Sequence, residues 1–350
     1  MSKKRKICII GHFADGKDFY DGQTVSTRLL REVLEKSGKF KKIYKVDTYN
    51  YKKRFLKVFF SWVWCELTCN YIVVMLSGGG RKVFSPLLYY ANKIFRRKIF
   101  HRVIGGEFDA FLGRNPKCIK YSNSFEVNWV QSQKLVDKLN EIGVHNAEYL
   151  ENFRNIVPVD VSKIPVNFTK PYRFCTFSRI SEEKGIGLAI KAISKINEIA
   201  EEIIAVLDIY GPIEDAYSQT FESLVEGHSD CVSYKGCVQT ECAVNVLKDY
   251  YMHLFPTTWV GEGFPGTIID CYNAALPTIA SDWAYNAEFI KEGKTGYLYD
   301  WKKPEQLVEK IILSIEEANN NYSLRKNCLE EAKRFNPEVI ANKIVGRIVK

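Results

Sequence analysis

Short apolar runs alternate with segments of helical periodicity along the chain. Residues 6–11 form the first run, KICIIG, which is typical of a strand in a parallel sheet. Residues 22–38, GQTVSTRLLREVLEKSG, then repeat apolar side chains at helical spacing and end at a glycine. A strand, a glycine-containing loop and a helix in this order predict a βα unit. The apolar positions of the helix are Val25, Leu29, Leu30, Val33 and Leu34.

The same alternation continues and predicts two α/β domains. Runs such as YIVVML and IFHRVIGG alternate with helical patterns such as SPLLYYANKIF, which favours a parallel sheet covered by helices on both faces. Residues 151–171 contain three prolines and little helical periodicity, so we place the linker there. Strand and helix patterns restart at YRFCTFS.

We therefore expect two Rossmann-like domains that face a central cleft. This arrangement gathers glycine loops and helix N-termini around one site. The predicted parts are a first domain at 1–155, a linker at 156–171, a second domain at 172–335 and a C-terminal helix at 336–350 that can cross back to the first domain.

Composition is that of a soluble globular protein. The 350 residues are 46% hydrophobic and 26% charged, which suits two domains of ordinary size. Ten cysteines are scattered without zinc or redox spacing, as expected for reduced thiols in the cytosol. The N-terminal apolar run is too short for a signal peptide. The segment FLKVFFSWVWCELTCNYIVVML is interrupted by Lys57, Glu66 and Asn70, so we expect no membrane span and a cytoplasmic protein.

Net charge is distributed unevenly between the two halves. Residues 1–170 hold 31 Lys and Arg against 15 Asp and Glu, a balance of +16, and the remainder holds 19 against 26, a balance of −7. A basic half attracts nucleic acid, anionic lipid or a phosphorylated substrate by the same long-range field. No RNA-binding or DNA-binding signature accompanies it, so nucleic acid is not expected as a partner.

Two loops of the second half carry candidate ligand-binding residues. SRISEEKG presents Arg179 and Lys184 between a strand and a helix, where two cations suit a diphosphate. The alternative is a solvated loop in which neighbouring glutamates pair with them. Gly211 and Gly236 each follow a strand, where glycine allows a ligand close to the backbone but is also an ordinary turn residue.

The segment GEGFPGTIID, residues 261–270, places two acids around the start of a helix. Pro265 suits the first turn, and the exposed amides of Gly266 and Thr267 would form an anion site. Glu262 and Asp270 can both accept hydrogen bonds from sugar hydroxyls. Alternatively, acids near a helix N-terminus simply interact favourably with the helix dipole.

Five segments occur in the order and spacing of a known family. SRISEEKG, DIYGP, SYKGCV, FPTTWVGEGFPGTIIDCYNAALPTIASD and IKEGKTGYLYD resemble the C-terminal domain of family 4 glycosyltransferases over residues 172–335, in particular bacterial polysaccharide and capsule enzymes. The resemblance implies the GT-B fold and retaining, metal-independent transfer from a nucleotide sugar. It implies no cofactor, a UDP-sugar as co-substrate, and an acceptor-side domain at 1–155.

The resemblance also implies roles for individual residues. Arg179 and Lys184 match the pair that binds the donor diphosphate, and Glu262 matches the acid that contacts the donor sugar. Asp270 stands where the family usually has a Glu that contacts the nucleotide ribose, so its reach is one methylene shorter. The remaining donor-binding positions are Gly22, Thr24, Gly211, Val238, Gly263, Phe264, Pro265, Gly266 and Thr267.

The first half departs from the family near the reacting carbon. Many members carry a His at the end of a strand, where Gly105 or Gly106 stands here. His101 lies upstream, inside the expected strand, and is interpreted as a core residue. Glu107 follows the glycines and could face the acceptor; a solvated loop is the alternative. These three residues, Gly105, Gly106 and Glu107, are the acceptor-side candidates.

Residues 49–64, YNYKKRFLKVFFSWVW, combine four basic residues with several aromatic ones. This composition suits either an interfacial helix on an anionic membrane or a helix packed on the sheet with a basic solvent edge. The function expected from all these features is transfer of a hexose to a growing, lipid-linked cell-surface glycan by a cytoplasmic, peripheral membrane enzyme. A nucleotide-sugar epimerase of the same fold and a non-catalytic partner subunit are the alternatives.

Overall fold

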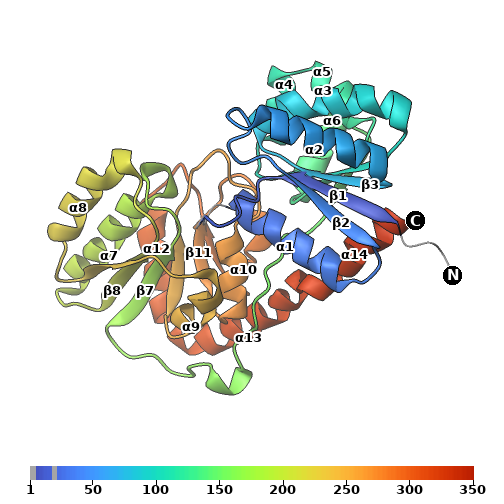
Figure 1. The fold of residues 1–350 in the computed structure, drawn as a ribbon. Helices are drawn as coiled ribbons and strands as arrows, with labels where there is room; N and C mark the ends of the chain where they lie inside the picture. The colour runs from blue at the N-terminus through green and yellow to red at the C-terminus, as the bar shows by residue number, and fades with distance from the viewer. Residues whose placement is uncertain (1–4, 18–21) are drawn as a thin grey trace. The chain divides into compact units, whose positions relative to one another are not determined.

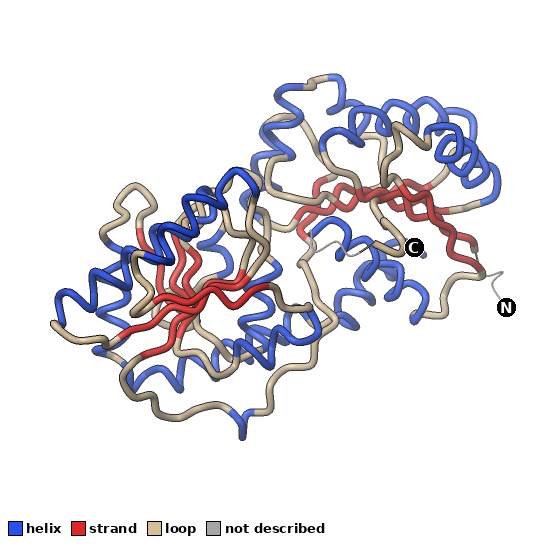
Figure 2. The backbone as a smooth tube through the Cα atoms, turned by 60° about the vertical axis from the view of Figure 1, so that its left-hand side comes forward, coloured by secondary structure: helices blue, strands red, loops and turns tan. Residues whose placement is uncertain are grey.

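The computed structural model describes residues 5–17 and 22–350 and shows two compact units. Unit 1 comprises Met1–Asn155 and Phe335–Lys350, and unit 2 comprises Ile156–Arg334. Each unit contains one six-stranded parallel sheet with helices on both faces (Figures 1 and 2). This confirms the predicted α/β fold class.

Unit 1 has the strand order β2-β1-β3-β4-β5-β6. Alternate strand residues face opposite sides, so Ile7 and Ile9 of β1 join one apolar core, and Cys8 and Ile10 join the other. Helices α1 and α14 contribute to the first core, and α2 and α3 to the second. The elements are β1 (Lys6–Gly11), α1 (Gly22–Lys36), β2 (Lys42–Asp47), α2 (Phe55–Thr68), β3 (Tyr71–Met75), α3 (Gly78–Phe95), β4 (Lys98–Arg102), α4 (Phe108–Arg114), α5 (Lys117–Ser122), β5 (Val127–Val130), α6 (Gln133–Glu141), β6 (Ala147–Tyr149) and α14 (Pro337–Val349).

Unit 2 has the strand order β12-β11-β10-β7-β8-β9. Helices α7 and α12 share one apolar core with the sheet, and α9 and α10 share the other. The elements are β7 (Tyr172–Phe177), α7 (Ile186–Ala200), β8 (Ala205–Tyr210), α8 (Ser218–Glu226), β9 (Val232–Gly236), α9 (Ala243–Leu247), β10 (Met252–Phe255), α10 (Gly266–Asn273), β11 (Thr278–Ser281), α11 (Asn286–Phe289), β12 (Gly296–Tyr299), α12 (Gln306–Glu316) and α13 (Asn321–Ala332), with short 3-10 turns that include η2 (Glu182–Lys184).

None of the helices within the described ranges is both long and apolar enough to span a bilayer. The interrupted segment around Lys57 and Asn70 folds instead as α2 followed by β3. The buried face of α2 packs against the sheet of unit 1 through Val58, Trp62 and Cys65.

Candidate active site

The carboxyl edge of the unit 2 sheet brings together two loops that carry candidate residues. Strands β7 and β10 are parallel neighbours, so the loops that follow them start at the same edge. The loop after β7 carries Arg179 and Lys184, and the loop after β10 carries Glu262 and leads into α10. Residues 78 positions apart in the sequence are thereby brought together.

Lys184 and Glu262 form a buried ion pair. The ammonium Nζ of Lys184 donates to Oε2 of Glu262, and the two residues are 8% and 5% exposed. Thr257 Oγ1 donates a second hydrogen bond to the same oxygen at 3.1 Å. Because a buried charge is costly without a partner, this pair fixes the two loops in register.

Trp259 lies against both cations of this edge. The centroid of its ring is 4.5 Å from Lys184 Nζ and 5.4 Å from Arg179 Cζ, within the range of a cation–π contact. Its backbone is held as well: the amide donates to Thr257 Oγ1 at 3.2 Å, and the carbonyl accepts from Trp283 Nε1 at 2.8 Å. Trp259 was not among the predicted site residues; the only signal for it in the sequence is an aromatic residue in the loop that precedes GEGFPG.

Arg179 differs from Lys184 in its surroundings. Its side chain is exposed, and across the described residues no carboxylate lies within ion-pair distance of its guanidinium. Lys184 is neutralised by Glu262, whereas Arg179 offers its full positive charge and five donors to an anion.

Close backbone packing requires a glycine at the predicted position 211 and also at position 185. Gly211 has φ +137°, and a Cβ there would lie 1.8 Å from the carbonyl oxygen of Ser178. Gly185, directly after Lys184, has φ +71°, and a Cβ would lie 2.2 Å from the carbonyl oxygen of Pro256. Packing therefore accounts for Gly211 whether or not a ligand binds beside it.

Helix α10 begins at Gly266, with Pro265 at the capping position; the proline side chain caps none of the first amides, and the amide of Ile268 donates to the Pro265 carbonyl at 3.1 Å. Thr267 Oγ1 is buried and, within the part of the chain described, has no hydrogen-bond partner. Asp270 is 3% exposed. The ring of Phe264 stacks on Phe289 with centroids 3.8 Å apart, so its side chain serves packing. The start of α10 is therefore an uncapped set of amides beside buried acids.

The other donor candidates lie in loops or at a helix start. Gly263 and Val238 are partly exposed, Val238 in the loop after β9. In unit 1, Gly22 is the exposed first residue of α1. Thr24 is fully buried, and its Oγ1 lies 2.6 Å from Nδ1 of His12. That hydroxyl is thus already engaged with an imidazole at the end of β1.

The acceptor-side candidates follow β4 in unit 1. Gly105 has φ +81°, in the left-handed region that favours glycine, and Gly106 is buried. Glu107 precedes α4 and lies 3.8 Å from Arg114 across an ion pair. Both side chains of this pair are largely exposed to solvent.

His101 is buried inside β4, as expected for a strand-interior residue. Its Nδ1 lies 2.9 Å from Oδ1 of Asn128, and the rings of Phe108 and Phe125 contact it edge-on. Burial, with a smaller effect of Arg81, lowers the pKa of His101 to about 3. A neutral, enclosed imidazole is a core group and not a titrating base.

The sequence profile described as "Glycosyl transferases group 1" matches residues 160–335, which include the whole cluster around Trp259. The chain belongs to this glycosyltransferase family. The predicted enzyme class is confirmed at the level of the family.

Individual relatives share about a quarter of their aligned residues with this chain. The GtfA subunit of the UDP-N-acetylglucosamine–peptide N-acetylglucosaminyltransferase of Streptococcus pneumoniae is 26% identical over 199 residues, which cover 53% of this chain and 38% of that protein. The amylovoran biosynthesis glycosyltransferase AmsK of Erwinia amylovora is 25% identical over 37% of this chain and 32% of its own length. The matches thus span well under half of these curated relatives.

The crystal structure of Anabaena HepE in complex with UDP has the same fold along the entire chain. The TM-score is 0.73, with 14% sequence identity and 99% of each chain covered. At this identity the likeness establishes the GT-B architecture and nothing about the substrate.

Proposed function

We propose that this group 1 glycosyltransferase moves a hexose from a UDP-sugar to a hydroxyl of a growing, lipid-linked cell-surface glycan, with retention at the anomeric carbon and without a metal ion. We further propose that it works at the cytoplasmic face of a membrane. The HepE structure contains UDP, GtfA is named for UDP-N-acetylglucosamine, and AmsK is named for amylovoran biosynthesis. These properties of other proteins support the proposal, and the resemblance of the five motifs supports the retaining mechanism.

The cluster of Arg179, Lys184 and Glu262 around Trp259 is the observation that carries the proposal. A donor diphosphate carries two negative charges, and the exposed Arg179 can bind its oxygens bidentately. Lys184 then exchanges part of its contact with Glu262 for a phosphate oxygen. The carboxylate released in this way can accept a hydrogen bond from a sugar hydroxyl.

In the proposed reaction the bond between the anomeric carbon and the phosphate oxygen breaks, and the acceptor oxygen bonds to the same face of that carbon. The acceptor proton passes to the departing phosphate. Arg179 and Lys184 stabilise the negative charge on the leaving UDP, and the free amides at the start of α10 add partial positive charge. The protein therefore supplies positioning and electrostatics.

The remaining candidates have supporting roles in this proposal. Asp270 bonds the ribose directly or through water, given its shorter reach. Gly211, Val238 and the backbone of 263–267 surround the donor. Gly22 and Thr24 belong to the loop that closes on the diphosphate, and Gly105, Gly106 and Glu107 lie on the acceptor side.

A donor screen with an acceptor extract tests this function. We expect UDP release from one UDP-sugar only when acceptor is present, and the release should persist in excess chelator. Arg179→Ala should lower kcat/KM by about 100-fold, as expected for removing a cation that stabilises the leaving group. Arg334→Ala, an exposed arginine elsewhere in unit 2, is the matched control.

Two outcomes would redirect the proposal. An isomerised donor sugar without transfer would identify an epimerase, and glycan assembly unaffected by Arg179→Ala and Glu262→Gln would identify a non-catalytic subunit. Because Glu262→Gln leaves Lys184 buried without its carboxylate, its loss of stability of about 3–5 kcal/mol must be measured by urea unfolding alongside activity.

A further inference from the structure

Helix α2 of unit 1 has two apolar faces, of which only one is buried. The inner face contacts the sheet through Val58, Trp62 and Cys65. The opposite face repeats apolar side chains at positions 56, 60, 64 and 67, a helical spacing. These four residues, which we call the outer stripe, are Leu56, Phe60, Trp64 and Leu67, and they are between 55% and 69% exposed.

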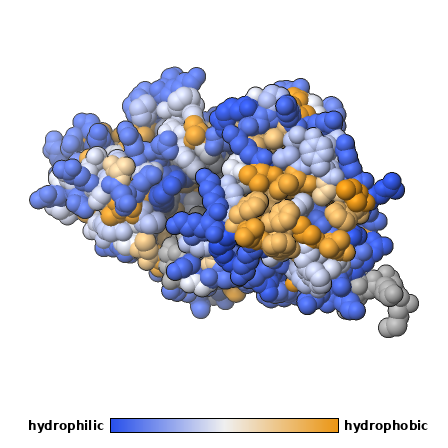
Figure 3. Space-filling view, turned by 45° about the horizontal axis from the view of Figure 1, so that its top comes forward, coloured by the Kyte–Doolittle hydropathy of each residue, from blue (hydrophilic) through white to orange (hydrophobic). Residues whose placement is uncertain are grey.

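The outer stripe extends into an aromatic cluster at the start of the helix. Phe55 stacks on Phe59 with ring centroids 6.0 Å apart, and Phe59 contacts Phe60 at 5.8 Å. Figure 3 shows apolar side chains gathered on this face of unit 1 and bordered by hydrophilic ones. Helix α2 thus packs on the sheet, as the second interpretation of residues 49–64 expected, but its solvent face carries large apolar side chains in addition to the basic ones. A contiguous apolar surface of this kind marks an interaction site.

Basic side chains surround the start of the outer stripe. Lys52, Lys53 and Lys57 are exposed, and no Asp or Glu occurs between Asp47 and Glu66. Arg54 also belongs to this basic segment, but it already has an acidic partner, because its guanidinium lies 3.9 Å from the carboxylate of Asp47. The positive charges thus lie where an inserted helix would meet anionic headgroups.

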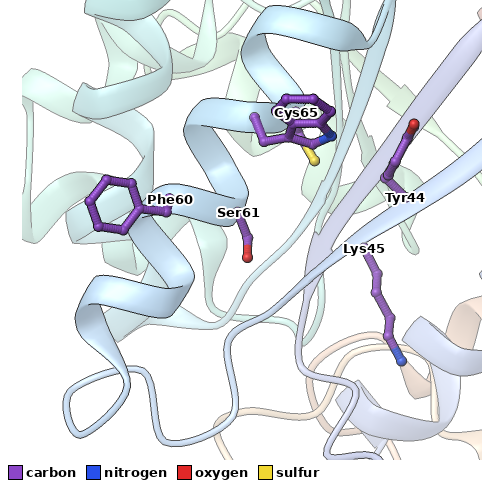
Figure 4. Close-up of a pocket in the computed structure, with 6 residues that line it drawn as sticks. Tyr44, Lys45, Phe60, Ser61 and Cys65 are labelled. Atoms are coloured by element: carbon purple, nitrogen blue, oxygen red, sulfur yellow. The ribbon is translucent and has the colours of Figure 1, made fainter.

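A shallow pocket of about 370 Å³ borders the same stripe. Phe60, Ser61, Trp64 and Cys65 of α2 line it on one side and Tyr44 and Lys45 of β2 on the other. Figure 4 shows the labelled residues of the two elements beside one another. Phe60 and Trp64 therefore belong both to the exposed stripe and to the lining of this pocket.

We propose that the outer stripe of α2 inserts into the interface of an anionic membrane, with Lys52, Lys53 and Lys57 on the headgroups. The helix lies flat on unit 1, so its whole length of roughly 21 Å can be in the plane of the interface. A second copy of the chain is a poorer occupant, because its α2 offers these lysines no exposed carboxylate: no Asp or Glu occurs between Asp47 and Glu66, and Glu66 is buried. The cellular role of this membrane contact rests on the proposed lipid-linked acceptor. The binding of α2 to an anionic membrane does not depend on that proposal.

Vesicle sedimentation without donor or acceptor tests this proposal. We expect the full chain to pellet with vesicles of equal parts phosphatidylcholine and phosphatidylglycerol, and far less with phosphatidylcholine alone. The double variant Phe60→Ser/Trp64→Ser should bind at least about tenfold more weakly, since two large apolar side chains no longer leave water. Lys52→Gln/Lys53→Gln/Lys57→Gln should lose the preference for anionic vesicles.

Control variants separate insertion from misfolding. Val157→Ser and Ile199→Ser remove exposed apolar side chains of unit 2 and should bind as the original chain does. Circular dichroism should show every variant folded.

Three outcomes would overturn the proposal. Two of them are equal binding of the Phe60→Ser/Trp64→Ser variant and the original chain, and no binding of the original chain to either vesicle. The third is a dimer that Phe60→Ser disperses, because the face would then be a protein interface. UDP release with a water-soluble acceptor should be unchanged in these variants, so a failed transfer assay and a failed vesicle assay are distinguishable.

Discussion

The indole ring of Trp259 lies against both cations that we assign to the donor diphosphate. A cation–π contact favours the charged form and restricts the side chain that carries it. Gly261 makes room for the ring, because a Cβ at that position would lie 2.6 Å from it. We therefore infer that Trp259 is a positioning residue for Lys184 and Arg179.

Replacing Trp259 should weaken the donor site without unfolding the protein. We expect Trp259→Leu to lower kcat/KM for the UDP-sugar by about tenfold, which corresponds to about 1.4 kcal/mol of lost positioning. Trp259→Phe keeps a π face and should recover part of the loss. Initial rates over a range of donor concentrations measure both.

A substitution of another tryptophan distinguishes the positioning of the two cations by Trp259 from a general effect of losing an indole ring. Trp64→Leu alters an exposed tryptophan of unit 1 and should leave transfer to a soluble acceptor unchanged. If Trp259→Leu and Trp259→Phe lose activity equally, the ring face has no special role and only its size matters.

Sequence patterns predict which residue types meet at the site better than they predict their contacts. The motifs identified Lys184 and Glu262 as separate groups, one for phosphate and one for sugar. The structure joins them in a buried ion pair, which depends on the pairing of β7 with β10 and so leaves no local trace in the sequence. The cation–π contacts of Trp259 were missed for the same reason. The assigned catalytic roles stay predictions.

At the scale of elements, the loops after β7 and β10 are held together at Gly185. Lys184 precedes this glycine, and α7 begins directly after it. Its left-handed backbone and the nearby carbonyl of Pro256 leave no space for a side chain. The position of Lys184 thus depends on a backbone contact between the two loops.

Gly185→Ala should therefore lower the free energy of unfolding by more than an ordinary glycine-to-alanine substitution does. Strain at positive φ alone costs roughly 1–2 kcal/mol, and the clash with Pro256 adds to it. Gly236→Ala is the matched control: its φ is +78°, yet no atom of the described residues lies within 4 Å of the added methyl group. Urea unfolding should show the larger loss for Gly185→Ala, accompanied by weaker UDP binding. Equal losses would show that the loops can separate without cost.

Glu66 gives helix α2 a pH dependence of its own. The carboxyl is 1% exposed, accepts from Trp62 Nε1 at 3.1 Å, and has Arg97 as a neighbouring charge. Burial raises the pKa of Glu66 from 4.5 to about 7, although the Trp62 bond and Arg97 oppose the rise. The folded state therefore keeps this proton at a pH where the unfolded chain has lost it.

The sign of the effect on stability follows from that difference. Between about pH 4.5 and pH 7 the folded state binds more protons, so the contribution of Glu66 to stability falls as the pH rises, by about 3 kcal/mol in all. Glu66→Gln keeps an acceptor for Trp62 but cannot ionise. We expect equal unfolding free energies for both proteins near pH 4.5 and a more stable variant above about pH 7.

The Glu66→Gln variant must be compared with the original chain at each pH, because other groups also make the stability depend on pH. His101 and His253 are buried with pKa values lowered to about 3, so they withdraw stability as the pH falls below their usual range. These contributions cancel in the difference between Glu66→Gln and the original chain. Parallel stability curves would show that Glu66 is ionised at no cost in the folded state.

At the scale of the whole molecule, the chain builds unit 1 from both of its ends. Helix α14 adds Ile340, Ile344 and Ile348 to the core that α1 shares with the sheet. The alternation of strands and helices allowed the α/β fold to be predicted, because each element carries its own periodicity. For residues 49–64 the sequence left two interpretations open, an interfacial helix and a helix packed on the sheet, because composition alone does not show which faces of α2 stay exposed.

Nucleotide binding should affect the two units differently. The groups that we assign to UDP lie mainly in unit 2, at residues 178–185 and 259–270, so UDP should slow amide hydrogen exchange in those segments. At about 100 times Kd it should stabilise the protein by about 2.7 kcal/mol. Segments of β2 and α2 should exchange at the same rate with and without UDP. Protection that reaches residues 22–24 would also support the roles of Gly22 and Thr24.

The Arg179→Ala variant tests whether this protection comes from the assigned diphosphate site. The variant should lose the protection by UDP, while its exchange in the absence of UDP should match that of the original chain. Persistent protection in this variant would place the diphosphate elsewhere.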